Sequence, residues 1–170
     1  KEIQNLANVF TSRTKSKLVI ANFDIPTYSS HGIIETKIEY GFHQMIEDLN
    51  RGLIDFFANS DSIYVYDFNG FISRYGEDNV FDYRQFFFGD MKISLDYIPY
   101  LANDLMGYII GYLGLSKKCI VLDLDNTLWG GIIGEDGFNG IRLGPEPPGN
   151  SYLEFQRVLL SLYQRGIILA

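Results

Sequence analysis

Short, continuous apolar runs alternate along this chain with segments whose apolar residues recur at helical spacing. The runs lack the polar alternation of a strand with one wet face, so they predict strands that are buried on both faces. These strands are expected at residues 18–23, 63–68, 119–125 and 167–170. Helices are expected at residues 3–10, 38–58, 99–113 and 151–163. The alternation predicts an α/β fold class built on parallel sheets.

A boundary between two domains is expected close to residue 115. Gly114 can end the preceding helix, and Lys117 and Lys118 form a short charged linker before the next strand. A chain of 170 residues is long enough for one ordinary domain or for two small or incomplete ones. We therefore assign residues 1–115 and 116–170 to two separate regions.

Charge and composition exclude several classes of partner. The net charge is −7 and there is no basic run, so neither nucleic acid nor an anionic membrane is expected to bind. No apolar stretch reaches the roughly eighteen residues that indicate a membrane-spanning helix. The single cysteine, Cys119, lies in a strand that we expect to be buried. A lone thiol excludes an internal disulfide and favours a reducing, cytoplasmic location.

The third expected strand ends in two carboxylates. Asp123 and Asp125 follow the apolar run 119–122, and side chains two residues apart on a strand point the same way. Two like charges held side by side raise the free energy of the folded state unless a cation or a reacting group uses them. In open α/β sheets, ligands bind at the carboxyl ends of the strands. Oxygen ligands there suit Mg²⁺, which can orient a phosphoryl group for attack by a carboxylate.

Other interpretations of the Asp-x-Asp pair fit less well. An EF-hand loop that began at Asp123 would need Gly at its sixth position and Glu at its twelfth, where the chain has Leu128 and Gly134. A glycosidase pair is disfavoured because neighbouring carboxylates on one strand do not flank a sugar. The non-functional alternative is a strand end with two solvated acids. The length of the string CIVLDLDNTLWGG argues against it.

The string VLDLDNTLWGG (121–131) resembles motif I, Asp-x-Asp-x-Thr, of the haloacid dehalogenase (HAD) superfamily. Its continuation through GEDG (134–137) and IRLGP (141–145) resembles the FkbH-like branch of that superfamily. By this resemblance, Asp123 is the nucleophile that forms an aspartyl-phosphate, and Asp125 is the general acid/base. The Asp123 carboxylate and the Asp125 backbone carbonyl would ligate Mg²⁺.

The resemblance also implies roles for the residues that follow the two carboxylates. Thr127 would hold the loop by hydrogen bonding, and Asn126 would shape the same turn. Gly130, Gly131 and the next glycines would form a flexible flap, because glycine accepts backbone angles that other residues resist. A HAD site also needs a Ser or Thr, a Lys and a later acidic residue, and none of these can be assigned before Ala170. The HAD domain is therefore expected to be incomplete.

Residues 1–115 resemble, by their order and spacing, the latter part of the SGNH-hydrolase-like (flavodoxin-like) domain that precedes the HAD domain in FkbH-like proteins. The SGNH nucleophile block would lie before Lys1. The Asp-x-x-His pattern of the SGNH base is not kept, because Asp82 is followed by Gln85. His31 is expected to be an ordinary loop histidine, and no esterase activity is expected.

The favoured interpretation is part of an FkbH-like enzyme, with a parallel-sheet SGNH-like region followed by a truncated, Rossmann-like HAD domain. The resemblance implies Mg²⁺-dependent phosphoryl or acyl transfer on a small phosphorylated substrate, such as a three-carbon acyl donor, with an acyl carrier protein as acceptor. A plain HAD phosphatase and a non-catalytic interaction module with a vestigial motif I remain alternatives. The chain alone is expected to lack turnover, and the sheet edge at 167–169 would favour self-association.

Overall fold

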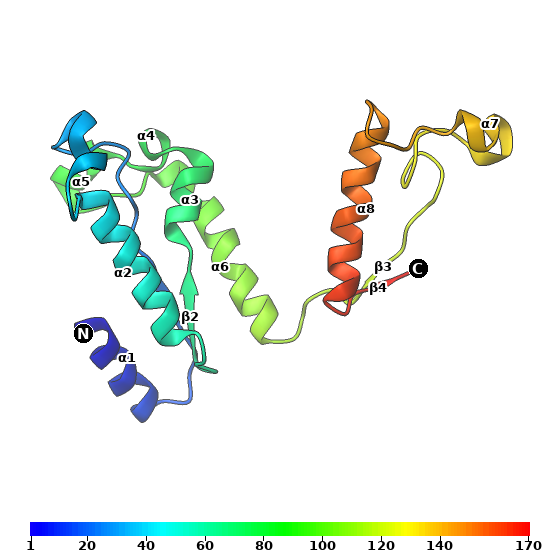
Figure 1. Cartoon of the computed structure of the whole chain (residues 1–170). Coiled ribbons are helices and arrows are strands. Elements are labelled where there is room, and N and C mark those ends of the chain that lie inside the picture. Colours follow the sequence, from blue (N-terminus) through cyan, green and yellow to red (C-terminus); the bar gives the residue numbers. More distant parts are fainter. The chain divides into compact units, whose positions relative to one another are not determined.

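The chain folds into two compact units, which are described separately. The structure is a computed structural model that describes every residue from Lys1 to Ala170. Unit 1 comprises Lys1–Tyr108 and unit 2 comprises Ile109–Ala170 (Figure 1). The division falls within helix α6 (Ile98–Tyr112), earlier than the boundary expected from the sequence. No helix combines the length and the apolar character that a membrane crossing requires.

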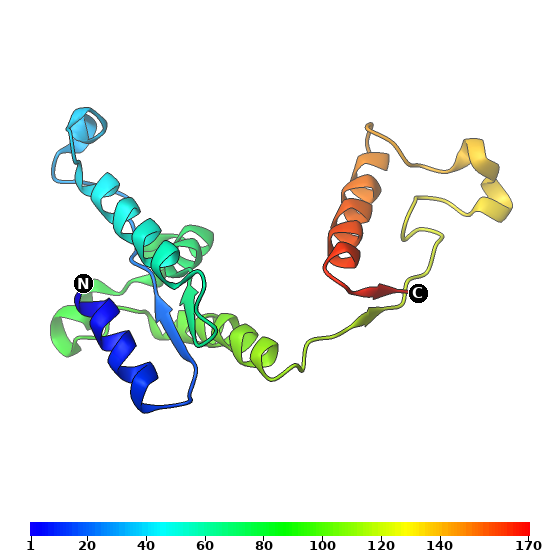
Figure 2. The same ribbon diagram turned by 60° about the horizontal axis from the view of Figure 1, so that its bottom comes forward.

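Unit 1 is built on two parallel strands, β1 (Leu18–Ala21) and β2 (Ile63–Tyr66), with Leu18 opposite Ile63 (Figure 2). Parallel strands need a long crossover, and α2 provides it here. The helical elements are α1 (Glu2–Arg13), η1 (Gly32–Lys37), α2 (Phe42–Phe57), α3 (Phe68–Tyr75), α4 (Glu77–Val80), α5 (Tyr83–Gly89), η2 (Leu95–Tyr97) and α6.

The two strands bury alternate side chains on opposite faces, so helices cover both sides of the sheet. The first core contains Ala7, Leu53, Phe57 and Ile63, with Ile3, Leu18, Ile20 and Val65 packed against it. The second core contains Tyr66, Phe71, Ile72, Val80 and Phe81, and residues of α6 pack against it. Helices α1 and α2 therefore lie on one side of the strands and α6 on the other (Figure 1). This arrangement confirms the mixed α/β prediction, with short parallel strands.

The strand expected at 63–68 is shorter than predicted and ends at Tyr66. The Asp67 carboxylate accepts a hydrogen bond from the backbone N–H of Gly70 over 2.9 Å and thereby caps α3. An aspartate at this position satisfies one of the backbone donors that the first helical turn leaves unpaired. The helix therefore begins where the sequence predicted that the strand would continue.

Three short helices of unit 1 were not predicted. The polar segment 73–79, for which the sequence predicted no regular element, belongs largely to α3 and α4. Helix α5 begins after Asp82, whose carboxylate accepts a hydrogen bond from the backbone N–H of Gln85 over 2.9 Å. Each of these helices is too short to show a helical repeat of apolar residues, so periodicity could not reveal them.

Unit 2 contains one parallel strand pair and the two helices that lie between its strands in the chain. Its elements are β3 (Cys119–Ile120), α7 (Ile133–Gly140), α8 (Gly149–Gln164) and β4 (Ile168–Leu169). The ladder continues to Leu122, whose N–H donates to the carbonyl of Ala170 over 2.8 Å. The strand expected over 119–125 is therefore shorter than predicted, and Asp123 follows its carboxyl end.

Cys119 is exposed, so the prediction that it lies in a buried strand is wrong. Leu122 lines an apolar groove together with residues of α8. Side chains alternate along a strand, so Cys119 and Val121 point to the opposite face, and Val121 is also exposed. The strand pair of unit 2 is therefore covered by a helix on one face alone.

The glycine-rich segment 130–150, for which the sequence predicted no helix, contains helix α7, which is interrupted at Gly137 (φ 65°, ψ 177°). Residues 151–154 (Ser-Tyr-Leu-Glu) have the sequence pattern of a capping box, but no such box forms, because α8 begins two residues earlier, at Gly149. The Ser151 hydroxyl donates to the carbonyl of Pro148 over 2.7 Å instead of accepting from a backbone N–H. Gly166, with φ 93°, follows the end of α8, and glycine is the usual residue where a helix stops in this left-handed conformation.

Candidate functional site

Asp123 lies directly after the strand ladder of unit 2, and its side chain is exposed. Its Oδ1 accepts a hydrogen bond from the backbone N–H of the next residue, Leu124, over 2.7 Å. That contact is local and leaves the second oxygen open to solvent or to a ligand. A free carboxylate oxygen at the carboxyl end of a parallel strand can act as a nucleophile or bind a hard cation.

Asp125 is held more firmly than Asp123. Its Oδ1 accepts one hydrogen bond from the indole Nε1 of Trp129 over 2.9 Å and a second from the backbone N–H of Ile133 over 3.2 Å. The backbone N–H of Leu128 donates to the carbonyl of Leu124 over 2.9 Å, so the chain closes a tight, non-helical turn here. This turn brings the indole of Trp129 back to the Asp125 side chain.

Asn126 and Thr127 belong to the same turn. Asn126 has φ 56°, a left-handed conformation that asparagine tolerates better than most residues. Its side-chain Oδ1 accepts from the N–H of Gly131 over 2.8 Å, and the N–H of Thr127 donates to the carbonyl of Leu124 over 3.2 Å. The two carboxylates therefore do not continue one straight strand, which corrects the expectation drawn from their spacing.

Gly130 and Gly131 begin the segment that was expected to be a flap. Gly130 N–H donates to the carbonyl of Arg142 over 3.0 Å, and Arg142 N–H donates to the carbonyl of Gly130 over 2.7 Å, so the intervening segment is closed at its base. Gly131 has φ 101°, and a Cβ there would lie 2.9 Å from Oδ2 of Asp136. Glycine is therefore needed at this position for both conformation and space.

The strand end of unit 2 offers oxygen ligands but not a complete metal cage. No group of three or more His, Cys, Asp or Glu side chains is placed to hold a metal ion. Mg²⁺ is usually bound by one or two carboxylates together with waters and substrate phosphates. Asp123 and the backbone carbonyl of Asp125 therefore fit part of a Mg²⁺ site that a phosphorylated substrate would complete.

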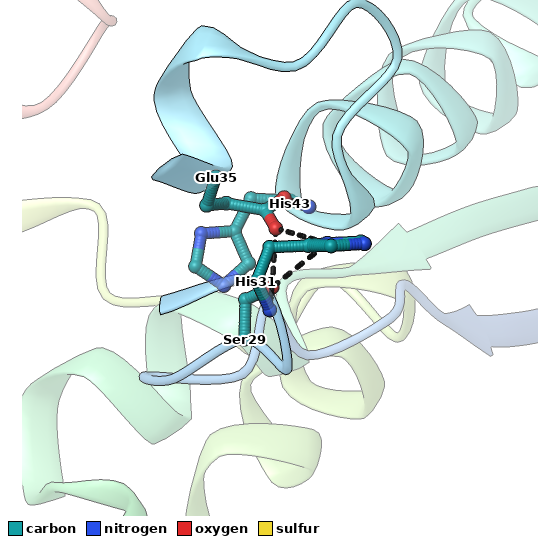
Figure 3. Close-up of polar contacts among 4 residues, drawn as sticks. All are labelled: Ser29, His31, Glu35 and His43. Atoms are coloured by element: carbon teal, nitrogen blue, oxygen red, sulfur yellow. Dashed lines mark hydrogen bonds and ion pairs between the residues drawn. The ribbon is translucent and has the colours of Figure 1, made fainter. Parts of the chain in front are cut away.

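A second polar cluster, in unit 1, was not predicted. Glu35 of η1 is buried, and its carboxylate accepts hydrogen bonds from the Ser29 hydroxyl and, over 2.9 Å, from the backbone N–H of His43 (Figure 3). His31 Nδ1 lies 3.0 Å from the same carboxylate. The Ser29 hydroxyl, followed by the His43 N–H, lowers the pKa of Glu35 to about 2. The anion ties this loop to the start of α2, where the helix dipole favours negative charge.

Ser29, His31 and Glu35 do not have the geometry of a hydrolase triad. In a triad, one histidine nitrogen faces the serine and the other faces the carboxylate. Here the Ser29 hydroxyl bonds Glu35 directly, and it lies 3.4 Å from the same Nδ1 that contacts Glu35. A carboxylate with so low a pKa is also a weak base. The cluster is therefore a clamp between a loop and a helix, and His31 is more than an ordinary loop histidine.

A hollow of about 310 Å³ lies beside this clamp. The buried Glu77 in its wall accepts hydrogen bonds from the N–H of Thr27 over 2.8 Å and from the Tyr83 hydroxyl over 3.0 Å. Burial alone would raise the pKa of Glu77, but these hydrogen bonds lower it below its ordinary value. Lys92 Nζ lies 3.2 Å from the Asp24 carboxylate. Because each charged group in its wall already has a partner in unit 1, the hollow is a weaker candidate site than the strand end of unit 2.

Comparisons with known proteins place the chain in a family. No curated protein matches it. Among solved structures, it resembles the N-terminal part of the protein BF1531 from Bacteroides fragilis, which contains a phosphatase domain and was crystallised in complex with Mg. The TM-score is 0.85 and the identity 27%, over 99% of this chain and 45% of that chain. Residues 1–110 match the family described as the FkbH N-terminal domain. Because this match spans well over half of the sequence, the chain belongs to the FkbH family.

Proposed function

We propose that the chain carries the nucleophile of a Mg²⁺-dependent phosphoryl-transfer enzyme of the HAD type. The observation that carries the proposal is the strand end of unit 2, where an exposed Asp123 is followed by an anchored Asp125. The similar Bacteroides fragilis protein contains a phosphatase domain and was crystallised with Mg, which supports the proposal. In this account residues 116–170 begin the HAD domain and residues 1–115 form an SGNH-like region.

Each carboxylate has a distinct part in the proposed reaction. An oxygen of Asp123 attacks the phosphorus of a small phosphorylated substrate, and the bond from phosphorus to the leaving oxygen breaks. Asp125 gives its proton to that leaving oxygen and later takes a proton from the acceptor that attacks the aspartyl-phosphate. Mg²⁺, held by the Asp123 carboxylate and the Asp125 backbone carbonyl, would offset the negative charge that builds up on the phosphoryl oxygens.

The acceptor that attacks the aspartyl-phosphate determines which reaction the enzyme catalyses. With water as acceptor the enzyme is a phosphatase, and the phosphatase domain of the similar structure favours this outcome. The finer proposal is transfer from a phosphorylated three-carbon acyl donor to an acyl carrier protein, as the FkbH-like resemblance implies. A non-catalytic interaction module, with the two carboxylates vestigial, is the contrasting proposal.

The test uses the full-length protein and three variants. Asp123→Asn is expected to abolish Mg²⁺-dependent hydrolysis of para-nitrophenyl phosphate, because an amide is a very poor nucleophile. Asp125→Asn is expected to slow it, because the proton donor is lost. Glu135→Gln removes an exposed acid of the same unit and serves as the matched control.

Calorimetry of Mg²⁺ binding to the same proteins distinguishes a Mg²⁺-dependent enzyme from a non-catalytic interaction module. The account expects weaker Mg²⁺ binding in Asp123→Asn than in the wild type or in Glu135→Gln. Hydrolysis that persists in Asp123→Asn would place the nucleophile elsewhere. A wild-type protein with neither turnover nor Mg²⁺ binding would favour the interaction module.

A further inference from the structure

The indole of Trp129 is placed to control the direction of the Asp125 carboxylate. Trp129 Nε1 donates to Asp125 Oδ1 over 2.9 Å, and the backbone N–H of Ile133 donates to the same oxygen over 3.2 Å. Both hydrogen bonds fall on one oxygen, and Oδ2 carries neither of them. A carboxylate that is held at one oxygen by two donors presents its other oxygen in a fixed direction.

The support behind the indole is also fixed. The Trp129 ring is half-buried, and it lines an apolar groove together with Leu143 and with Leu153 of α8. The carbonyl of the preceding residue, Leu128, accepts a hydrogen bond from the Gln156 side chain of α8 over 2.6 Å. The turn that carries Trp129 is therefore tied to α8 by a polar contact, and the ring is held by apolar neighbours.

Asp123 shows that this anchoring is specific to one of the two carboxylates. Its hydrogen bond comes from the N–H of the next residue, Leu124, so no distant group restrains its side chain. A nucleophile must move toward phosphorus as the new bond forms, whereas a general acid must meet the leaving oxygen at a set place. The two carboxylates, which look equivalent in the sequence, are thus supported in different ways.

We propose that Trp129 is a positioning residue for Asp125. Its indole N–H holds Oδ1 so that Oδ2 faces the leaving oxygen of the substrate. The proposal rests on the proposed function, in which Asp125 is the general acid/base. Ile133 stands at the start of α7, so its N–H links the flap segment to the same carboxylate oxygen.

The hydrogen bond is tested by NMR on the 170-residue chain, without any measurement of activity. Trp129 is the single tryptophan, so its indole N–H gives one signal whose assignment is unambiguous. Asp125→Ala is expected to move this signal toward that of an exposed indole and to speed its exchange with water. Asp123→Ala is the matched control and is expected to leave the signal in place. An indole N–H signal that stays unchanged in Asp125→Ala, or that moves equally in both variants, overturns the proposal.

The positioning role is tested by kinetics on the full-length enzyme. Trp129→Phe keeps an aromatic ring in the groove and removes the donor. We expect kcat to fall by about 10- to 100-fold, with KM and Mg²⁺ affinity unchanged. Phe88→Leu alters an aromatic side chain of α5, in unit 1, that is 88% exposed, and it is expected to leave kcat unchanged.

The two measurements fail in distinguishable ways. A wild-type kcat in Trp129→Phe, or a loss confined to KM, overturns the positioning role. A full-length protein that is inactive as wild type contradicts the proposed function, and in that case the NMR comparison still decides whether Trp129 holds Asp125.

Discussion

Asn50, in α2, joins that helix to the chain that follows β1. Its side chain is buried and forms two hydrogen bonds with the backbone of Phe23. Phe23 N–H donates to Asn50 Oδ1 over 2.8 Å, and Asn50 Nδ2 donates to the carbonyl of Phe23 over 2.7 Å. The amide thus pairs with the backbone as a neighbouring strand would, and it fixes the path of the chain toward Asp24.

Asn50→Ala removes both hydrogen bonds and leaves two backbone groups of Phe23 without a protein partner. Each hydrogen bond between neutral groups contributes about 1 kcal/mol, and a buried group left unpaired costs about 1–3 kcal/mol. Phe23 is 38% exposed, so water can replace part of what is lost. We therefore expect the free energy of unfolding to fall by about 2–3 kcal/mol.

Urea unfolding followed by circular dichroism measures this change. Asn8→Ala is the matched control, because it makes the same substitution at an exposed position of helix α1. Both variants gain the same helix propensity, which is at most about 0.7 kcal/mol. The control is expected to stay within about 0.5 kcal/mol of the wild type, apart from that gain. If Asn50→Ala lost no more stability than Asn8→Ala, the reasoning about the buried amide would be refuted.

Three further predictions concern the core, the clamp and the flap. Phe71 is fully buried, so Phe71→Ala should lower the free energy of unfolding by about 3–5 kcal/mol in the same urea assay, and an unchanged midpoint would contradict this. The pKa of Glu35 is lowered from 4.5 to about 2, so its stabilisation is full above about pH 4.5 and is lost as the pH falls toward 2. Urea midpoints measured across that window should drop less steeply in Glu35→Gln, and identical profiles would count against the clamp. Gly131→Ala should destabilise the flap by about 1 kcal/mol or more and speed amide exchange there, whereas Gly134→Ala, with open space around its added Cβ, should not.

Long helices could be predicted from the sequence because their apolar stripes face a core. The stripe in 38–58 predicted α2, and the stripe after Pro99 predicted α6. The start of α2 was missed by four residues, because the helix begins at Phe42. The buried carboxylate of Glu35 accepts from a backbone N–H in the first turn of α2, and sequence spacing alone does not show that contact.

Short helices and caps were harder to predict, because a single turn has no repeat to detect. Asp67 and Asp82 were the available signals for α3 and α5, since aspartate is a favoured N-cap residue. The capping-box pattern at Ser151 was misleading, because the chain already enters a helix at Gly149. A capping-box pattern identifies the start of a helix only where the preceding residues are not already helical.

The two carboxylates of the candidate site were identified from their spacing, but their geometry was not. A strand was expected to continue through Asp125, whereas the ladder ends at Leu122 and a tight turn with a left-handed residue, Asn126, follows. That turn is what brings Trp129 onto Asp125. Neither strand nor helix periodicity describes such a turn, so the spacing of the two residues did not reveal their contact.

The central claim is that Asp123 carries the phosphoryl group during turnover, and mass spectrometry tests it most directly. The full-length protein is incubated with Mg²⁺ and para-nitrophenyl phosphate, quenched in acid and digested with pepsin at the same low pH, because an acyl phosphate hydrolyses at the alkaline pH that trypsin requires. Fragmentation of the peptide that contains both Asp123 and Asp125 distinguishes the two carboxylates. We predict one phosphoryl group on this peptide, located at Asp123 and absent from Asp123→Asn. A phosphoryl group at Asp125, or an unmodified peptide from an enzyme that is turning over, would contradict the account.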